Sequence, residues 1–293
     1  MQLKWGMHKN SKDSLHAPAE VDTILKQVFG LTEFRGVQRA VIDSVLKGQD
    51  QLVLMPTGMG KSLCYQLPAR VLGGLTVVIS PLIALMKDQV DAARKIGLRA
   101  TFINSTLSRE ERELRQRKLQ GGAFELLYVT PERFRKPEFC EAILTQKIKL
   151  FAVDEAHCVS QWGHDFRPDY SRLGEIREML GNPTTLALTA TATLQVQKDI
   201  LHQLNITHAQ IQEAGLTRPN LAIEMMGVHG MDEKVRAFVM QRHLHPGAAI
   251  LYFSLVETLY KFSDELRRLG MLHLIYHGQL PDGERRRAQE SFL

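Results

Sequence analysis

The stretch MPTGMGKS, residues 55–62, decides how this chain folds. The apolar run leading into it, residues 51–56, predicts a buried strand, and the pattern after it, residues 61–72, predicts a helix. A glycine-rich turn between a strand and a helix forms a concave row of backbone N–H groups, which binds phosphate oxygens. Gly58 and Gly60 permit backbone angles and close approaches that a side chain would block. The stretch therefore predicts a phosphate-binding loop.

Two side chains of this loop have expected roles. Lys61 would reach the β- and γ-phosphates of a nucleotide, and the Ser62 hydroxyl would hold Mg²⁺. The full motif begins with glycine, whereas Met55 stands there, and a bare Gly-Lys-Ser can be an ordinary turn. The flanking strand and helix, together with an acidic motif downstream, favour the nucleotide site. Its predicted residues are Pro56, Thr57, Gly58, Met59, Gly60, Lys61 and Ser62.

The composition is that of an ordinary soluble globular protein, with 44% hydrophobic and 24% charged residues. At 293 residues, the chain suits one large domain or two moderate ones of ~150 residues. No run approaches the ~18 apolar residues of a membrane span, and the polar N-terminus lacks the apolar segment of a secretory signal. The net charge of +5 mildly favours an anionic partner such as nucleic acid.

Three widely spaced cysteines, Cys64, Cys140 and Cys158, form no Cys-x-x-Cys pair. This usage predicts a reducing compartment, buried apolar roles for the thiols and no zinc site. We therefore expect a cytoplasmic protein without a membrane partner, associated with the nucleoid if it is bacterial.

Apolar runs alternate with helical patterns along most of the chain, after helical spacing over residues 21–48. Most of these runs are continuously apolar, as in parallel strands covered on both faces, which predicts a doubly wound α/β fold. The helix expected at residues 108–120 begins with a capping box, and its charges indicate a solvated face rather than a binding patch. The runs occupy residues 76–80, 100–104, 125–130, 150–154 and 184–191.

GLTRPN, residues 215–220, interrupts this pattern and predicts a hinge between two domains. We expect a flexible terminus at residues 1–20, a first lobe at 21–215, a junction at 216–220 and a partial second lobe at 221–293. The second lobe is expected to contain a helix at 255–270. Its predicted strands are residues 221–226, 248–254 and 272–278.

Acidic and hydroxyl side chains follow two of the predicted strands. Asp154 and Glu155 come directly after one, and Thr189 and Thr191 lie at the end of another. In an open parallel sheet the ligand site lies at the carboxyl ends of the strands. Asp154 is expected to hold Mg²⁺ and Glu155 to orient or deprotonate the attacking water. The alternatives are a helix N-cap for the acids and a merely threonine-rich strand end.

The phosphate loop, the DEAH stretch and the TAT stretch, in this order, resemble the first RecA-like lobe of a superfamily 2 helicase. The longer stretch DEAHCVSQWGHDFRPDY, residues 154–170, closely resembles the RecQ family of DNA helicases. The resemblance implies a RecA-like lobe followed by an incomplete second one. The match rests on Ser160, Gln161, Trp162, Gly163, His164, Asp165, Phe166, Arg167 and Pro168.

In that family the segment after the acids forms an aromatic-rich loop that senses single-stranded DNA and couples it to ATP hydrolysis. Trp162 and Phe166 could stack on bases, and Arg167 could pair with phosphate or stack; without the resemblance, Trp162 and Phe166 would be read as core residues. The expected catalytic residues are Lys61, Asp154, Glu155 and His157, the metal ligands are Ser62 and Asp154, and the DNA-binding or coupling residues are Gln161, Trp162, His164, Phe166, Arg167, Thr189 and Thr191.

Other segments resemble the same family. In residues 29–38, Arg35 and Gln38 match its adenine-recognition motif, although Leu31 replaces a frequent aromatic and Gly-Val at 36–37 replaces Pro-Gly. Gln38 could hydrogen-bond the adenine edge and Arg35 could stack on the ring. Segments resembling the DNA-backbone motifs, the interdomain junction (with Thr217 where Asp is common) and the second lobe are residues 80–90, 129–134, 217–220, 248–254 and 275–280.

The resemblance implies a 3′–5′ DNA helicase that uses ATP and Mg²⁺ on single-stranded and forked DNA, in repair or recombination. The alternative is an ATP- and DNA-binding module that does not unwind, because the motifs that carry the family's arginine finger would lie beyond Leu293. Arg285, Arg286 and Arg287 could replace that finger, but a solvated basic helix face is favoured. An RNA helicase of the same superfamily is disfavoured by the loop SQWGHDF.

Overall fold

The computed structural model describes residues 18–163, 165–215 and 221–292. The chain forms two compact units, residues 1–217 and 218–293. The predicted junction at residues 216–220 lies outside the described residues, as does His164.

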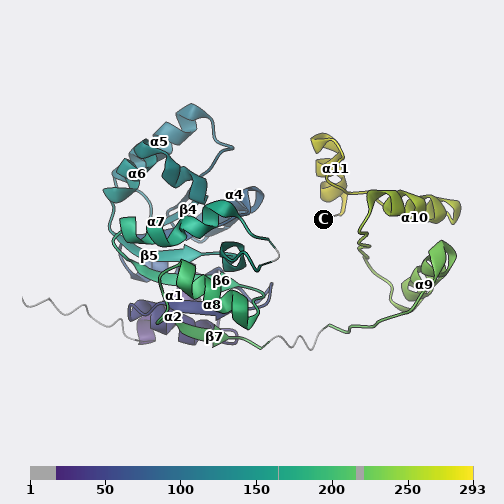
Figure 1. Ribbon diagram of the computed structural model, residues 1–293, viewed down its shortest axis with the longest axis horizontal. Helices are drawn as coiled ribbons and strands as arrows, with labels where there is room; N and C mark the ends of the chain where they lie inside the picture. Colours follow the sequence, from purple (N-terminus) through teal and green to yellow (C-terminus); the bar gives the residue numbers. More distant parts are fainter. Residues whose placement is uncertain (1–17, 164, 216–220, 293) are drawn as a thin grey trace, which may run out of the picture. The chain divides into compact units, whose positions relative to one another are not determined.

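A seven-stranded sheet forms the centre of the first unit, and all its strand pairs are parallel (Figure 1). The strand order is β3-β4-β2-β5-β6-β1-β7. Six strands confirm the sequence prediction, and the α/β class with a parallel sheet is confirmed with them. The strands are β1 Gln51–Leu54, β2 Leu75–Ile79, β3 Ala100–Ile103, β4 Leu126–Val129, β5 Ile148–Val153, β6 Thr184–Thr189 and β7 Gln210–Glu213.

Helices pack on both faces of this sheet, which is why its inner strands are largely apolar. Consecutive residues alternate between two hydrophobic cores: Val77 belongs to one and Val78 to the other, as do Phe151 and Ala152. A strand that is buried on both sides has no solvent-facing positions to fill with polar residues. The helices are α1 Pro18–Gln27, α2 Gln38–Leu46, α3 Leu63–Val71, α4 Ile83–Lys95, α5 Arg109–Gln120, α6 Pro137–Leu144, α7 Leu173–Met179 and α8 Leu194–Gln203.

The helix predicted at residues 108–120 has the expected start. Ser108 Oγ accepts a hydrogen bond from the Glu111 N–H, and the Glu111 carboxylate accepts one from the Ser108 N–H, so the capping box is confirmed. Most of α5 is exposed. This agrees with a solvated helix face.

β7 is absent from the sequence prediction. It reads Gln-Ile-Gln-Glu and has one apolar residue, Ile211, which is itself exposed. The strand forms because its backbone pairs in parallel with β1 at the edge of the sheet. Pairing of this kind needs no apolar pattern, so hydropathy could not indicate it.

A buried ion pair anchors the sheet where β1 and β6 begin. Arg177 donates to Asp50 Oδ2 at 3.1 Å and to Thr185 Oγ1 at 2.8 Å. The other oxygen of Asp50 accepts the Thr185 N–H at 2.7 Å, and His208 Nε2 lies 3.0 Å from Asp50 Oδ2. The side chains of Asp50 and Arg177 are both nearly inaccessible, so the pair depends on these mutual contacts.

The second unit contains the helices α9 Gly230–Leu244, α10 Val256–Arg268 and α11 Asp282–Phe292. Val235, Phe262 and Leu266 form its small core. The helix predicted at 255–270 is confirmed, but the three strands predicted at 221–226, 248–254 and 272–278 were wrong: residues 221–292 contain no strand.

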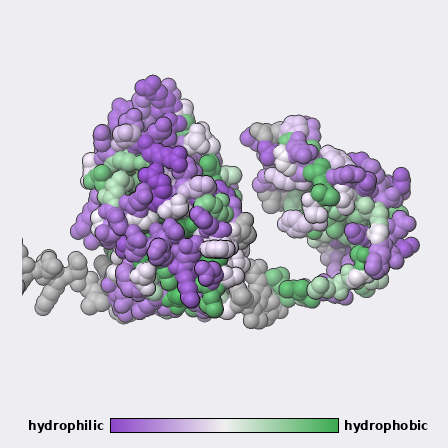
Figure 2. Space-filling model, in the orientation of Figure 1, coloured by the Kyte–Doolittle hydropathy of each residue, from purple (hydrophilic) through white to green (hydrophobic). Residues whose placement is uncertain are grey.

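These three apolar runs lack the backbone partners that define a strand. Ile223 is 91% exposed and Tyr252 is 90% exposed, so the runs bury little apolar area against other residues. In Figure 2, green hydrophobic surface marks the first of these runs, which begins at residue 221. No helix among the described residues is long and apolar enough to span a membrane.

Candidate active site

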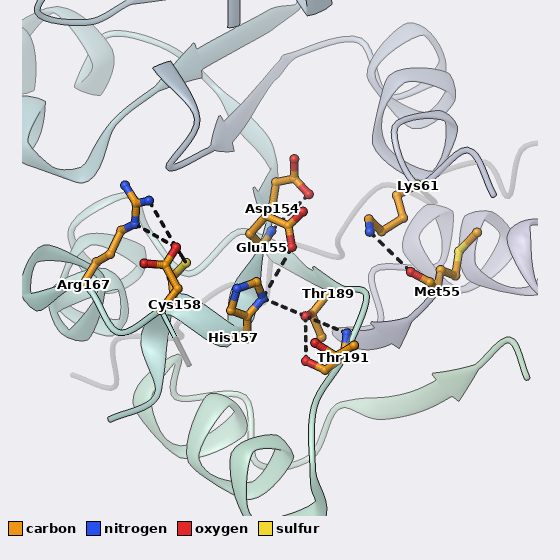
Figure 3. A network of polar contacts seen from close by, with 10 residues as sticks. Met55, Lys61, Asp154, Glu155, His157, Cys158, Arg167, Thr189 and Thr191 are labelled. Atoms are coloured by element: carbon orange, nitrogen blue, oxygen red, sulfur yellow. Dashed lines mark hydrogen bonds and ion pairs between the residues drawn. The ribbon is translucent and has the colours of Figure 1, made fainter. Parts of the chain in front are cut away.

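The phosphate loop lies between the end of β1 and the start of α3, as predicted. Gly58 has φ +86° and Gly60 has φ +78°, angles that side chains rarely adopt. Lys61 Nζ donates to the Met55 carbonyl at 3.3 Å, so the residue that replaces the first glycine holds the lysine through its backbone (Figure 3). Pro56 is buried, whereas Thr57 and Gly58 are exposed. These angles are compatible with the predicted phosphate-binding loop, whose role stays a prediction.

Gln38 forms hydrogen bonds with this loop. Its side-chain amide donates to the Met59 carbonyl at 2.9 Å and to the Gly60 carbonyl at 3.0 Å, and its oxygen accepts the Arg35 N–H at 2.8 Å. Gln38 is only 2% exposed. Both N–H groups of the Gln38 amide thus donate to carbonyls of the loop. Adenine recognition by Gln38 and by the exposed Arg35 stays a prediction.

Asp154 and Glu155 follow β5 and lie at the carboxyl end of the sheet, near the phosphate loop. Burial and the neighbouring Glu155 charge together raise the pKa of Asp154 to about 6, and the Glu155 N–H and Lys61 limit this rise. The Glu155 N–H donates to Asp154 Oδ1 at 3.0 Å. A half-buried carboxylate with a raised pKa is a group that a divalent cation would stabilise, so Asp154 fits the predicted Mg²⁺ site.

Glu155 occupies the left-handed region, with φ 48° and ψ 49°. A residue other than glycine held there stores about 1–3 kcal/mol of strain, which is common at functional sites. Its Oε2 lies 3.4 Å from His157 Nδ1. The strained turn after β5 thus places this carboxylate beside His157 (Figure 3).

His157 connects the acids to the neighbouring strand end. Its Nδ1 lies 3.0 Å from Thr189 Oγ1, and the Thr189 hydroxyl bonds the backbone of Thr191 (Figure 3). Thr189 is completely buried, whereas Thr191 is exposed. Its burial leaves Thr189 no surface for direct contact with DNA, and a coupling role for this residue stays a prediction.

Trp162 projects from the segment that follows the acids. Its side chain is 73% exposed, Gln161 is exposed, and Phe166 is half-buried. The alternative reading of Trp162 as a core residue is thereby excluded. The backbone N–H of Trp162 donates to the buried Ser160 hydroxyl at 3.2 Å, so a hydrogen bond holds the backbone that carries the exposed ring.

Arg167 ties this segment to two other parts of the site. Its guanidinium donates to Asp165 Oδ2 at 3.1 Å and to the Pro81 carbonyl at 3.1 Å, just before α4. Cys158 donates from its thiol to the same Asp165 oxygen at 3.6 Å. Ligand atoms of His157, Cys158 and Asp165 lie within 4.8 Å of one another. Hydrogen bonds already engage all three side chains.

The cysteines have the predicted environments in part. Cys64 and Cys158 are buried, Cys140 is half-buried, and none of the three forms a disulfide. Burial raises the pKa of the Cys64 and Cys158 thiols to about 12, so both stay protonated at neutral pH.

Two contacts at the site were not predicted from the sequence. Ser62 Oγ donates to Gln89 Oε1 on α4 at 3.3 Å, and Arg167 reaches Pro81 across 86 positions of sequence. Both join segments that are distant in the chain, and a motif marks only contiguous residues.

Arg286 and Arg287 are exposed on α11, as a solvated helix face requires.

Comparisons with known proteins agree with this geometry. The family model of DEAD/DEAH box helicases matches residues 35–200. The chain is 41% identical over 270 residues to the ATP-dependent DNA helicase RecQ of Haemophilus influenzae, covering 92% of this chain and 43% of that protein. It is 38% identical over 271 residues to the probable ATP-dependent DNA helicase RecS of Bacillus subtilis, covering 92% and 54%. The chain spans about half the length of the curated relatives it matches.

Solved structures share the fold. The hypothetical ATP-dependent RNA helicase from Sulfolobus tokodaii matches with a TM-score of 0.55 at 21% identity, over 94% of this chain and 79% of that one. The S. cerevisiae Dbp5 structure with RNA and ADP BeF3 matches with a TM-score of 0.65 at 17% identity, over 96% and 72%. At these identities the matches establish the RecA-like fold alone.

Proposed function

The chain belongs to the DEAD/DEAH box helicase family, and we propose that it acts as an ATP-dependent DNA helicase of the RecQ type. It would couple ATP hydrolysis to 3′–5′ movement on single-stranded DNA and to the opening of forked duplexes. The identities to proteins named RecQ and RecS support this assignment. The resemblance suggests a role in DNA repair and recombination.

One observation carries the proposal. A tryptophan that is 73% exposed stands directly beyond the acids, and its segment is hydrogen-bonded to both Pro81 and Cys158 through Arg167 and Asp165. Exposed aromatic rings stack on unpaired bases, worth about 1–3 kcal/mol per base. Exposure of so large an apolar ring costs solvation energy unless a ligand covers it. The exposed ring therefore supports single-stranded nucleic acid as the proposed ligand.

Each residue of the nucleotide site has a part in the proposed reaction. Lys61 would leave the Met55 carbonyl and bind the phosphates, while Ser62 and Asp154 would hold Mg²⁺. The cation supplies charge stabilisation on the phosphate oxygens. Glu155 would orient the attacking water, and the contact of His157 with Thr189 would link this end of the sheet to the TAT turn.

The test is steady-state ATP hydrolysis by the chain alone, with single-stranded DNA, with single-stranded RNA and without nucleic acid. Lys61→Ala serves as the blank. We expect turnover above the blank that DNA stimulates more strongly than RNA. Equal or greater stimulation by RNA would favour an RNA helicase. Nucleotide and DNA binding with turnover no higher than the blank would favour a binding module that does not unwind.

A further inference from the structure

The hydroxyl of Ser62 has a partner outside the phosphate loop. It donates to the side-chain oxygen of Gln89 at 3.3 Å. Gln89 is half-buried in the middle of α4, and its neighbours Met86 and Val90 are buried in the core. A packed helix therefore presents an uncharged acceptor to the hydroxyl of the expected Mg²⁺ ligand.

A serine hydroxyl that binds a metal uses an oxygen lone pair, so its proton needs an acceptor elsewhere. If the acceptor is water, the hydroxyl can rotate and its lone pairs point in several directions. If the acceptor is fixed, one orientation is favoured before the metal arrives. Preorganisation of this kind improves binding because less freedom is lost on complex formation.

We infer that Gln89 is a positioning residue for the Mg²⁺ ligand Ser62: its amide oxygen accepts the hydroxyl proton and directs a lone pair toward the metal. The inference rests on the proposed nucleotide site. It adds to that site a residue from α4 that acts only through Ser62.

A purely structural role for Gln89 predicts a different result from a positioning role. Loss of packing would weaken nucleotide binding with and without Mg²⁺ and would lower stability. Loss of positioning would change only the Mg²⁺-dependent part. A variant that keeps an acceptor oxygen, Gln89→Glu, should preserve positioning, whereas Gln89→Met, similar in length but without an acceptor, should abolish it.

The experiment measures binding of a fluorescent ATP analogue while Mg²⁺ is titrated, with thermal unfolding recorded for each variant. For Gln89→Met we expect about a fivefold rise in the Mg²⁺ concentration at half-saturation, as for the loss of one neutral hydrogen bond. Affinity in EDTA should be unchanged. Gln89→Glu keeps an acceptor oxygen and adds a negative charge near the cation, so its Mg²⁺ midpoint should be no higher than that of the parent. Gln120→Met, at an exposed glutamine on α5, is the matched control.

A double-mutant cycle completes the test, because Gln89→Met should have no further effect in a Ser62→Ala background. Gln89→Ala replaces Gln89→Met if the latter unfolds. An unchanged Mg²⁺ titration, or an equal loss in EDTA, would overturn the inference and leave the proposed function standing. If the parent chain binds the analogue no better than Lys61→Ala does, the proposed function falls, and the inference with it.

Discussion

Replacement of Gly163 by alanine tests the link between the exposed tryptophan and the nucleotide site. A Cβ at this position would lie 2.5 Å from the His157 carbonyl oxygen and 3.1 Å from that of Ser160. Real Cβ contacts do not fall below 3.0 Å, so the first gap must open by at least 3.0 − 2.5 = 0.5 Å. Both neighbours are backbone atoms, and neither can turn aside as a flexible side chain would.

The displacement would reach His157, a proposed catalytic residue, through backbone hydrogen bonds. The Gly163 N–H donates to the Ser160 carbonyl, the Ser160 N–H donates to the His157 carbonyl, and the His157 ring bonds Thr189. Overpacking of this size costs about 1–3 kcal/mol. Because misplacement of about 1 Å can reduce a rate by about a hundredfold, we expect DNA stimulation of hydrolysis to fall by at least about tenfold.

The assay compares the unfolding free energy, from urea denaturation, and the DNA-stimulated ATPase rate of Gly163→Ala with those of the parent. Gly215→Ala is the control, because a Cβ there would meet nothing within 4 Å. We expect ATP binding to be retained, since Gly163 lies outside the phosphate loop. A Gly163→Ala protein with full stability and full DNA stimulation would refute the steric reasoning.

Trp162→Ala should lose most DNA stimulation while binding ATP analogue as tightly as the parent, and a loss of analogue affinity in a fluorescence titration would argue against a DNA-sensing role. Arg177→Met should lower the unfolding free energy in urea by about 3–5 kcal/mol, because Asp50 would keep a buried charge without its guanidinium partner; a loss below about 1 kcal/mol, the range of exposed pairs, would contradict this. The folded pKa of Asp154, about 6, exceeds its ordinary value of 3.8, so the folded protein binds more protons than the unfolded chain between these pH values. The stability of the metal-free protein should therefore fall, by at most about 3 kcal/mol, as pH rises from about 4 to 6. Asp154→Asn should remove this fall, and equal pH profiles for both proteins would disprove the assignment.

The first unit could be predicted closely because local sequence and tertiary structure agree there. Val77 and Val78 face opposite cores, so a continuously apolar run indicates a strand covered on both sides. The phosphate loop is contiguous in sequence, and its glycine angles have few alternatives. β7 could not be predicted in the same way, since pairing with β1 rather than hydropathy places it.

The limits of prediction have the same physical origin in the site and in the second unit. The contact of Ser62 with Gln89 depends on how α3 and α4 pack, and residue spacing does not contain that information. Gln38 matches an adenine motif, yet its amide is satisfied by the phosphate loop. Ile223 and Tyr252 lie in runs with strand-like composition, but a strand also needs a neighbouring backbone.

The central claim is that Trp162 contacts bases and that the nucleotide site controls this contact. The chain has two tryptophans, Trp5 and Trp162, so a Trp5→Phe variant makes Trp162 the only indole fluorophore. Its emission would be titrated with single-stranded oligothymidylate, with and without Mg²⁺ and a non-hydrolysable ATP analogue. We predict quenching by DNA, with a midpoint that the nucleotide shifts in the parent and does not shift in Lys61→Ala. DNA binding, measured separately by anisotropy of a labelled oligonucleotide, with no change in Trp162 emission would contradict the account.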